Sequence, residues 1–273
     1  MRKKVLAVLM ALVALCAFAV AEETAEDWVK KGDELFMNGS DEEAVKAYDE
    51  AIKLNPKGIT AWLSKGIILS GLERHNESIE AYETAIEIDP KSIQAWGAMA
   101  DELYHLERYN ESLNAYNRVL QIDPQMARAW VEKGDILNKT DRYKEAIKAF
   151  DKALEIYDNA TQKNLEDADA WLGKGIVLEK MGRYEEAIES YDNVIEISSP
   201  YYALGAWIAK GDILKTIGRY EEAIKAYDKA IEISPNFSYA WESKGLALEA
   251  LGRNSEANAA FSEAKMLMYP KFL

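Results

Sequence analysis

Cysteine and histidine are scarce in this chain, and their scarcity excludes most side-chain chemistry. The 273 residues include one cysteine, Cys16, and two histidines, His75 and His105. Neither histidine has the spacing of a metal ligand set. The sequence also lacks a glycine-rich phosphate loop, an HExxH helix and a nucleophile elbow. We therefore expect no catalytic residue, no cofactor and no metal, and we predict that the protein is not an enzyme.

Positive charge is also in short supply. Lysine and arginine total 33 against 47 aspartates and glutamates, which gives a formal net charge of −14. A chain this acidic repels phosphate backbones, so we expect no nucleic-acid partner. The acidity is typical of a protein that must stay soluble in a polar medium.

The N-terminal residues have the composition of an export signal. Three basic residues at 2–4 precede an apolar run at 5–20, and a small-x-small cleavage site ends at Ala21. We predict that 1–21 is a signal peptide, which leaves a secreted or cell-surface chain without cysteine and hence without disulfides. A retained N-terminal anchor is the alternative, although this run is short for a membrane span. A lipid anchor on Cys16 is disfavoured because Leu15 is bulkier than the residue such an anchor needs there.

Tryptophan recurs in a single register. The seven tryptophans are spaced by 34 residues, except for one step of 41 and one of 36. A large aromatic residue at this interval is typical of a small structural unit that is copied along the chain and packed on its neighbours. The seven are Trp28, Trp62, Trp96, Trp130, Trp171, Trp207 and Trp241.

Each unit predicts two helices. Between 204 and 237, apolar residues recur at i, i+3, i+4 and i+7 in two segments. Gly218 suits the left-handed residue after the first segment, and Pro235 stops the second. We expect two antiparallel helices of roughly 12–14 residues in each unit. All six prolines are expected to close units, and the fourth unit, which lacks one, runs into an insertion at 157–167; the prolines are Pro56, Pro90, Pro124, Pro200, Pro235 and Pro270.

Glycines and aromatic residues keep their own positions in the repeat. An interior glycine costs a helix about 1 kcal/mol relative to alanine, so its recurrence predicts that a neighbouring element approaches the backbone there. We expect the aromatic residues of the second helices to fill the space between helices as core, not to form a cofactor site. The glycines are Gly32, Gly66, Gly134, Gly175, Gly211 and Gly245, with Ala100 in the third unit; the aromatics are Tyr48, Tyr82, Tyr116, Phe150, Tyr191, Tyr227 and Phe261.

The order Trp, Gly, Ala, aromatic, Ala and Pro within 34 residues resembles the tetratricopeptide repeat. The resemblance implies an all-α fold, a right-handed superhelical α-solenoid of antiparallel helix pairs, as a single domain over 22–273. It also implies a protein-binding role, and the export signal makes the chain similar to secreted or cell-surface members of archaeal type. The expected repeats are 25–58, 59–92, 93–126, 127–156, 168–203, 204–237 and 238–271.

One regular departure from the family is a lysine where a leucine usually precedes the glycine. We expect its aliphatic stem to pack and its ammonium group to reach a carboxylate on an adjacent helix. Met99 takes this place in the third unit, and the lysines are Lys31, Lys65, Lys133, Lys174, Lys210 and Lys244.

The resemblance implies that the first helices line an inner groove. The lysine-and-asparagine clamp that some relatives use to grip a peptide carboxylate is missing, so that function is not carried over. The matching positions are aliphatic or acidic, which favours an apolar ligand with basic residues, or a helix. The alternative is that the aspartates merely solvate a helix or pair with nearby lysines. The groove candidates are Asp33, Leu63, Ile67, Asp101, Val131, Asp135, Leu172, Ile176, Ile208, Asp212 and Leu246.

Six Asn-x-Ser/Thr triplets lie where the repeat predicts turns or helix ends. With an export signal they are candidates for N-glycosylation. The alternative is that turn chemistry alone enriches asparagine and serine at these places. The candidates are Asn38, Asn76, Asn110, Asn138, Asn159 and Asn236.

The C-terminal helix ends the chain with an unusually apolar stretch. An uncovered last helix is shaped to accept another first helix, so mature chains could associate head to tail into an open filament. The alternative is that 269–273 folds back and covers the end itself. The residues are Met266, Leu267, Met268, Tyr269, Phe272 and Leu273. The sequence thus predicts a non-enzymatic exported scaffold that binds proteins, with a self-assembling glycosylated filament and a peptide-binding groove as alternatives.

Overall fold

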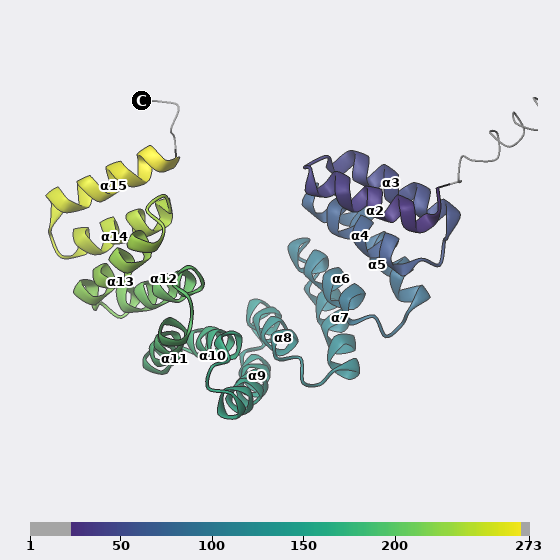
Figure 1. Cartoon of the computed structure of the whole chain (residues 1–273). Coiled ribbons are helices and arrows are strands. Elements are labelled where there is room, and N and C mark those ends of the chain that lie inside the picture. Colours follow the sequence, from purple (N-terminus) through teal and green to yellow (C-terminus); the bar gives the residue numbers. More distant parts are fainter. Residues whose placement is uncertain (1–22, 269–273) are drawn as a thin grey trace, which may run out of the picture. The chain divides into compact units, whose positions relative to one another are not determined.

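The computed structural model describes residues 23–268. Within this range the chain forms helices joined by short turns, with no strand. The described residues divide into two compact units, one that ends at Ile122 and one that begins at Asp123. Figure 1 shows that consecutive helices within each unit lie side by side in pairs. The predicted signal peptide at 1–21, and Tyr269, Phe272 and Leu273, lie outside the described residues.

Seven helix pairs, numbered repeats 1 to 7, make up the described residues, and they confirm the predicted all-α fold of consecutive helix pairs. The first helices of the repeats are α2 (Ala25–Met37), α4 (Ile59–Gly71), α6 (Ile93–His105), α8 (Ala127–Lys139), α10 (Ala168–Lys180), α12 (Pro200–Thr216) and α14 (Ser238–Ala250). The second helices are α3 (Asp41–Leu54), α5 (His75–Ile88), α7 (Tyr109–Ile122), α9 (Tyr143–Lys163), α11 (Tyr184–Ile197), α13 (Tyr220–Ile233) and α15 (Asn254–Met268). Over 23–268, none of these helices combines the length and apolarity needed to cross a bilayer.

The turn inside repeats 2 to 7 combines a left-handed residue with an arginine. Gly218 has the positive φ predicted for it, 79°, and Glu73 takes the same conformation in repeat 2 with φ 59°. The next residue in repeat 6, Arg219, donates from Nε and Nη2 to the two carboxylate oxygens of Glu222 at 2.6 and 2.5 Å. This forked pair satisfies both planar groups at the start of the second helix. It recurs as Arg74–Glu77, Arg108–Glu111, Arg142–Glu145, Arg183–Glu186 and Arg253–Glu256.

The recurring glycines lie against the recurring aromatic rings. A β-carbon at Gly32 would lie 2.6 Å from Cε1 of Tyr48, and one at Gly211 would lie 2.6 Å from Cε1 of Tyr227. These distances are too short for a β-carbon unless the ring shifts, so the ring packs directly on the helix backbone. Tyr48 and Tyr227 are almost completely buried. The predicted close approach to the glycines is therefore confirmed, and the aromatic side chain is the group that makes it.

The junction between repeats fixes five of the seven tryptophans through an indole hydrogen bond. In repeat 1 the side-chain oxygen of Asn55 accepts the main-chain N–H of Lys57 at 3.3 Å, which turns the chain. The carbonyl of Pro56 then accepts the indole Nε1–H of Trp62 at 3.0 Å. The same indole bond, at 2.9–3.0 Å, joins Trp96 to Pro90, Trp130 to Pro124, Trp171 to Leu165 and Trp241 to Pro235.

The segment at 157–167, expected to be an insertion, is helical as far as Lys163 and lengthens α9 to 21 residues. Residues 157–163 repeat the pattern of 150–156: the second segment begins Tyr-Asp-Asn-Ala where the first begins Phe-Asp-Lys-Ala. Seven residues are about two helical turns, so both copies present the same face. Phe150 packs on Gly134 of its own repeat, and Tyr157 packs on Gly173 of the next one. The 41-residue step is therefore an added heptad, not a loop.

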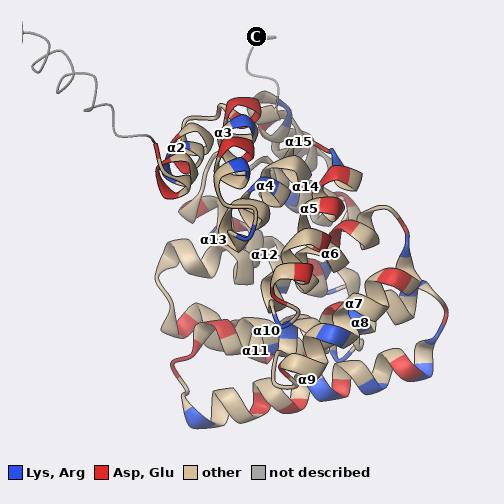
Figure 2. Ribbon diagram, turned by 90° about the vertical axis from the view of Figure 1, so that its right-hand side faces the viewer, with Lys and Arg blue, Asp and Glu red and all other residues tan. Residues whose placement is uncertain are grey.

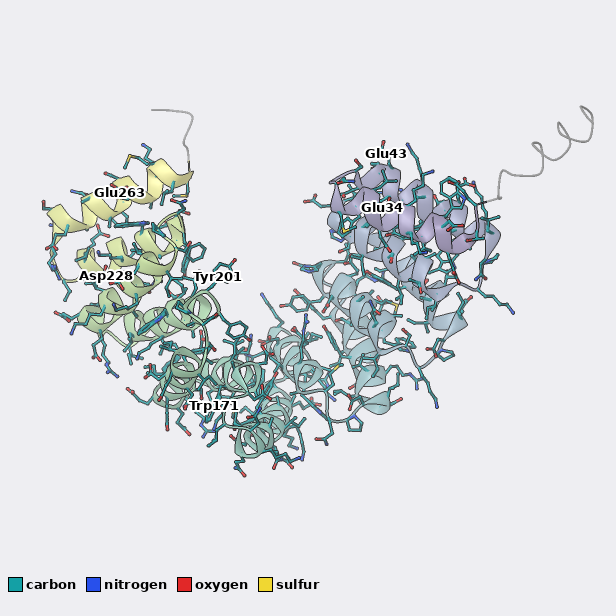
Figure 3. The ribbon with its side chains drawn as sticks, in the orientation of Figure 1. Glu34, Glu43, Trp171, Tyr201, Asp228 and Glu263 are labelled. Carbon is teal, nitrogen blue, oxygen red and sulfur yellow. The ribbon has the colours of Figure 1, made fainter. Side chains whose placement is uncertain are left out.

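Pro200 was expected to close a unit, and instead it opens α12, which has 17 residues. Proline suits the first turn of a helix because its missing N–H has no partner there and its φ is already helical. The added turn carries two tyrosines, and Figure 3 labels Tyr201, which is 83% exposed. The other prolines within 23–268 follow second helices as predicted: Pro56, Pro90, Pro124 and Pro235.

Candidate functional site

A hollow of about 320 Å³ opens on the first helices of the second unit. Its floor is apolar, and its two ionisable side chains are both acidic, Glu179 from α10 and Asp212 from α12. We call it the α12 hollow, because five of its residues come from that helix. It is lined by Glu179, Leu204, Gly205, Ile208, Ala209, Asp212 and Phe237.

The space around Gly205 in the hollow is open. A β-carbon at this position would meet nothing within 4 Å, in contrast to Gly211 on the same helix. Phe237, the residue before α14, forms one wall and packs against Tyr239 with ring centroids 6.1 Å apart. Both of these rings are more than a third exposed. The α12 hollow therefore offers exposed apolar surface beside carboxylates.

The two carboxylates of the hollow are held in place to different degrees. Asp212 accepts hydrogen bonds from the hydroxyls of Tyr227 at 2.8 Å and Tyr239 at 3.0 Å, and from the ammonium group of Lys215 at 3.2 Å. Glu179 accepts one from the hydroxyl of Tyr191 at 2.9 Å. The charge of Asp212 is thus partly compensated by a lysine, whereas the bond that Glu179 receives comes from a neutral group.

The other predicted groove aspartates are also bonded within the fold. Asp33 accepts the hydroxyl of Tyr48 at 2.6 Å, and Asp101 accepts that of Tyr116. In repeat 4 the aromatic residue is phenylalanine, and Asp135 instead pairs with Lys180 at 2.7 Å. The alternative in which aspartates pair with lysines therefore applies to Asp135 and Asp212, and the tyrosine bonds were not predicted.

The tyrosine hydroxyls are weakly acidic as a result. Burial, followed by the hydrogen bond to Asp33, raises the pKa of Tyr48 far above its usual range. Burial and then the hydrogen bond to Asp212 do the same for the pKa of Tyr227, while burial and then the charge of Glu179 raise that of Tyr191. Burial raises the pKa of Tyr82 to about 12. These hydroxyls therefore stay protonated donors at physiological pH.

The apolar groove candidates differ in accessibility. Ile67, Ile176 and Leu246 are exposed, while three others are half-buried: Leu63, Leu172 and Ile208. Val131 is only 7% exposed, so its short side chain belongs to the core and not to a groove. Ile208 and Asp212 are the two candidates that line the α12 hollow.

Sequence reasoning missed most of the residues that shape the hollow. Leu204, Gly205 and Phe237 lie outside the two first-helix positions that the family resemblance pointed to. A glycine in a first helix, but out of register with the recurring glycines, was the available signal for Gly205. Glu179 carried no signal, because acidic residues are frequent throughout the chain.

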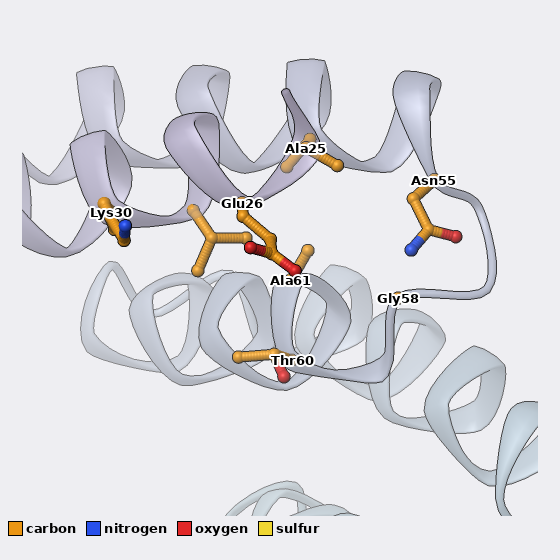
Figure 4. Close-up of a pocket in the computed structure, with 9 residues that line it drawn as sticks. Ala25, Glu26, Lys30, Asn55, Gly58, Thr60 and Ala61 are labelled. Carbon is orange, nitrogen blue, oxygen red and sulfur yellow. The ribbon is translucent and has the colours of Figure 1, made fainter. Parts of the chain in front are cut away.

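A second hollow, of about 380 Å³, lies in the first unit where α2 and α4 meet the end of α3 (Figure 4). Its lining is mostly small or polar and contains one acidic and one basic side chain, so it has no net sign of charge. The charge of this second hollow therefore favours neither a basic nor an acidic ligand, in contrast to the acidic α12 hollow. The lining residues are Ala25, Glu26, Val29, Lys30, Ala51, Asn55, Gly58, Thr60 and Ala61.

The recurring lysines make the contacts predicted for them in four repeats. Lys65 reaches Asp49 of the preceding second helix at 2.6 Å, and its ammonium group lies 5.6 Å from the ring of Trp62. Lysine over tryptophan is a favourable cation–π arrangement. The equivalent pairs are Lys174–Asp158 at 2.8 Å, Lys210–Asp192 at 2.5 Å and Lys244–Asp228 at 2.6 Å.

A serine, a histidine and a glutamate meet between repeats 2 and 3. Glu102 is 4% exposed and accepts the hydroxyl of Ser70 at 2.5 Å, while Nδ1 of His75 lies 2.7 Å from its other oxygen. The serine is thus bonded to the carboxylate and not to the imidazole, so the imidazole is not placed to activate it as a nucleophile. The cluster joins α4, α5 and α6. Residues 23–268 contain no group of three or more histidine, cysteine or acidic side chains suited to a metal ion.

The remaining candidates lie on the surface. All six sequon asparagines are exposed, namely Asn38, Asn76, Asn110, Asn138, Asn159 and Asn236. Met266 and Met268 of α15 are 39% and 46% exposed, and Leu267 is half-buried.

Comparison with known proteins accounts for this architecture. Models of the family described as tetratricopeptide repeat match 59–92, 93–126, 125–199, 166–236 and 206–267, and one described as TPR repeat matches 32–72. No curated protein matches the sequence.

Solved structures show the same fold at low identity. A tetratricopeptide repeat protein from Parabacteroides merdae has 18% identity and a TM-score of 0.67, over 92% of this chain and 95% of that one. The Cut9-Hcn1 heterotetramer of the APC/C gives 14% identity and a TM-score of 0.60, over 99% of this chain and 50% of that one. A MamA RS-1 double mutant gives 18% identity and a TM-score of 0.50, over 64% and 95%. The chain belongs to the tetratricopeptide repeat family, whose members are generally non-catalytic scaffolds that bind other proteins.

Proposed function

We propose that this chain is an exported, non-enzymatic scaffold and that its α12 hollow binds an apolar segment of a partner protein that also carries lysine or arginine. The observation that supports this most is the combination of exposed apolar lining, the open space at Gly205 and the acidic side chains of Glu179 and Asp212. Export, and a likeness to secreted archaeal members, rest on the N-terminal signal and the sequons.

The apolar contact is expected to supply most of the affinity. Burying one leucine-sized side chain contributes about 1.5–3 kcal/mol, whereas a partly exposed ion pair contributes about 0.2–1 kcal/mol. The leucine-sized anchor would occupy the space beside Leu204, Ile208 and Phe237. The carboxylate of Glu179 would then select for a basic neighbour and reject an acidic one.

Peptide selection with a matched pair of variants tests the proposal. Displayed peptides selected on the purified mature chain should share an apolar residue beside lysine or arginine. Gly205→Trp fills the α12 hollow and should weaken the selected peptide at least about tenfold, equal to about 1.4 kcal/mol. Gly97→Trp is the control, because Gly97 on α6 also has open space around its β-carbon position but lies in the other unit. Equal peptide affinity in wild type and Gly205→Trp would reject the proposal.

Head-to-tail self-assembly is the second candidate function. It is supported by the exposed side chains of Met266 and Met268 on the last helix. One feature opposes it, because Ser262 occupies the position of Asp228, so Lys31 of a following copy would find no aspartate there. Sedimentation of the mature chain should show concentration-dependent oligomers that the pair Met266→Lys and Met268→Lys, or removal of 269–273, disperses. A monomer at all concentrations would count against assembly.

Export and modification are tested on protein from its natural source. An intact mass that begins at Glu22 would support cleavage after Ala21. A mass that includes 1–21 would favour the retained anchor. Excess mass in hexose-sized steps would support glycosylation.

A further inference from the structure

The six Asn-x-Ser/Thr triplets fall into two classes, according to what the hydroxyl of the third residue does. In four of them that hydroxyl donates to a main-chain carbonyl of the fold. In the other two, which begin at Asn38 and Asn236, the third residues are Ser40 and Ser238, and neither hydroxyl has such a bond among residues 23–268. We call the four triplets with this bond closed and the two without it open. The closed triplets begin at Asn76, Asn110, Asn138 and Asn159.

Two of the closed triplets owe their serine to packing. Ser78 and Ser112 are 0% exposed, and their hydroxyls donate to the carbonyls of Gly66 at 2.8 Å and Ala100 at 2.7 Å. These bonds tie the second helix of a repeat to the first. Exposing either hydroxyl would require the two helices to separate.

In the other two closed triplets, side chains donate hydrogen bonds to carbonyl groups of the same helix. Nδ2 of Asn159 donates to the carbonyl of Glu155 at 2.8 Å, and the hydroxyl of Thr161, which is 2% exposed, donates to that of Tyr157 at 3.0 Å. Thr140, the third residue of the Asn138 triplet, donates to the carbonyl of Ile136 at 2.9 Å. Extending either triplet means unwinding a helix end or interior.

The two open triplets lie in connections between helices. Asn38 is the C-cap residue of α2 and precedes Gly39, which has φ +74°. Asn236 stands in the turn between α13 and α14. Both asparagines are exposed, and neither Ser40 nor Ser238 is buried, in contrast to Ser78, Ser112 and Thr161.

We propose that Asn38 and Asn236 are the N-glycosylation sites of the folded chain, and that the four closed triplets are not substrates once the repeats have packed. The proposal rests on the proposed export. The donor is an oligosaccharide on a polyprenyl diphosphate. The carboxamide nitrogen of the asparagine bonds to C1 of the first sugar as the C1–O bond to the diphosphate breaks. The lipid diphosphate leaves with the electron pair, and the amide proton passes to a base on the transferase.

In-vitro transfer to folded and unfolded chain tests this directly. The mature chain is treated with a purified oligosaccharyltransferase that accepts plain Asn-x-Ser/Thr sequences and with its lipid-linked donor, either native or reduced to overlapping synthetic peptides. Glycopeptide mass spectrometry then gives the occupancy of each site. In the folded chain, Asn38 and Asn236 should be modified at least about tenfold faster than the four closed sites, because the closed sites require local unfolding; these are Asn76, Asn110, Asn138 and Asn159. All six should be modified as peptides.

Two variants make the result independent of any single site. Asn38→Gln with Asn236→Gln should abolish modification of the folded chain, while Asn76→Gln with Asn110→Gln should leave it unchanged. Modification of Asn76 or Asn110 in the folded chain at the rate of Asn38 would overturn the proposal. So would failure of folded Asn38 and Asn236 when their peptides react. Natural protein that carries no glycan would instead count against the exported glycoprotein, and leaves this folded-state difference standing.

Discussion

Each repeat places an aromatic ring from its second helix on the backbone of its first helix. In six repeats the residue under the ring is glycine, and a β-carbon at Gly32, Gly175 or Gly211 would lie 2.6–2.7 Å from a ring carbon. Repeat 3 has Ala100 at this position, and it is fully buried, so a methyl group is accommodated there. The glycine therefore sets how closely the two helices approach.

Two glycines of α12 provide a matched test of this contact. Gly211→Ala should lower the free energy of unfolding by about 1 kcal/mol, because the overpacking against Tyr227 exceeds the gain in helix propensity. Gly205→Ala should raise it by about 0.5–1 kcal/mol, because the new methyl group meets open space. Urea unfolding measures both. Equal effects of the two substitutions would refute the proposed role of the ring.

The buried tyrosines predict how the fold responds to alkali. In the unfolded chain a tyrosine hydroxyl ionises near pH 10, about two units below the pKa of about 12 that burial gives Tyr82. A raised folded-state pKa means that the protonated hydroxyl stabilises the fold fully below about pH 10 and that this stability is lost as pH rises through 12 and above. Tyr48, Tyr191 and Tyr227 should behave in the same way.

Tyrosinate absorbance and circular dichroism, followed together against pH, check this prediction. The buried tyrosines should ionise only as helicity is lost. Ionisation of all 15 tyrosines in one step near pH 10 with the helices intact would contradict it.

At this scale the sequence predicted the packing better than the hydrogen bonds. The glycine register and the lysine register pointed to the close approach and to pairs such as Lys244–Asp228. The bonds from Tyr48 to Asp33 and from Tyr227 to Asp212 were missed. The rings were assigned to the core, and no partner was sought for their hydroxyl groups. A buried hydroxyl needs a partner, and that rule would have found them.

At the scale of helices, α9 shows how the repeat tolerates extra residues. The heptad 157–163 supplies a second aromatic residue and a second aspartate. Phe150 therefore packs on Gly134 of its own repeat, while Tyr157 packs on Gly173 of the next repeat. Asp158 pairs with Lys174 at 2.8 Å. In other repeats one heptad of the second helix contacts both the first helix of its own repeat and the first helix of the next repeat. In α9 these two contacts are made by two successive heptads.

Deletion of whole and partial heptads tests this reading. Removing 157–163 takes out about two turns and keeps the buried face in register, so the variant should keep its helicity and unfold cooperatively. Removing only 157–161 also deletes Tyr157 but rotates the residues that follow by about 140°, so this variant should be clearly less stable than the variant without 157–163. Thermal unfolding followed by circular dichroism compares the two. If both deletions behave alike, helical phase is not what the segment preserves.

Helix boundaries were the part of the fold that the sequence predicted least well. The segment at 157–167 lacks a proline and departs from the 34-residue frame, so it was expected to lie outside the repeats although its own heptad pattern is helical. Pro200 was expected to end a unit because the other prolines do, but proline fits the start of a helix as well as the turn after one. In both cases a spacing rule was given more weight than the local pattern.

For the whole molecule, charge and apolar surface have different roles. Lysine and arginine lie among aspartate and glutamate along the helices (Figure 2), and many form pairs three residues apart such as Arg253–Glu256. Exposed pairs of this kind contribute about 0.2–1 kcal/mol each, so the repeats are held chiefly by buried apolar side chains. Under the proposed function, partner choice depends on exposed places such as the α12 hollow, where apolar lining and carboxylates coincide.

The proposed function requires the partner to contact the first helices of the second unit, at the α12 hollow. Hydrogen–deuterium exchange of the mature chain, with and without a segment selected for binding, locates the contact most directly. We expect slower exchange at 176–179, 204–212 and 237–246, with the second helices unchanged, and loss of that protection in Gly205→Trp. Protection confined to the second helices, or protection that persists in Gly205→Trp, would contradict it.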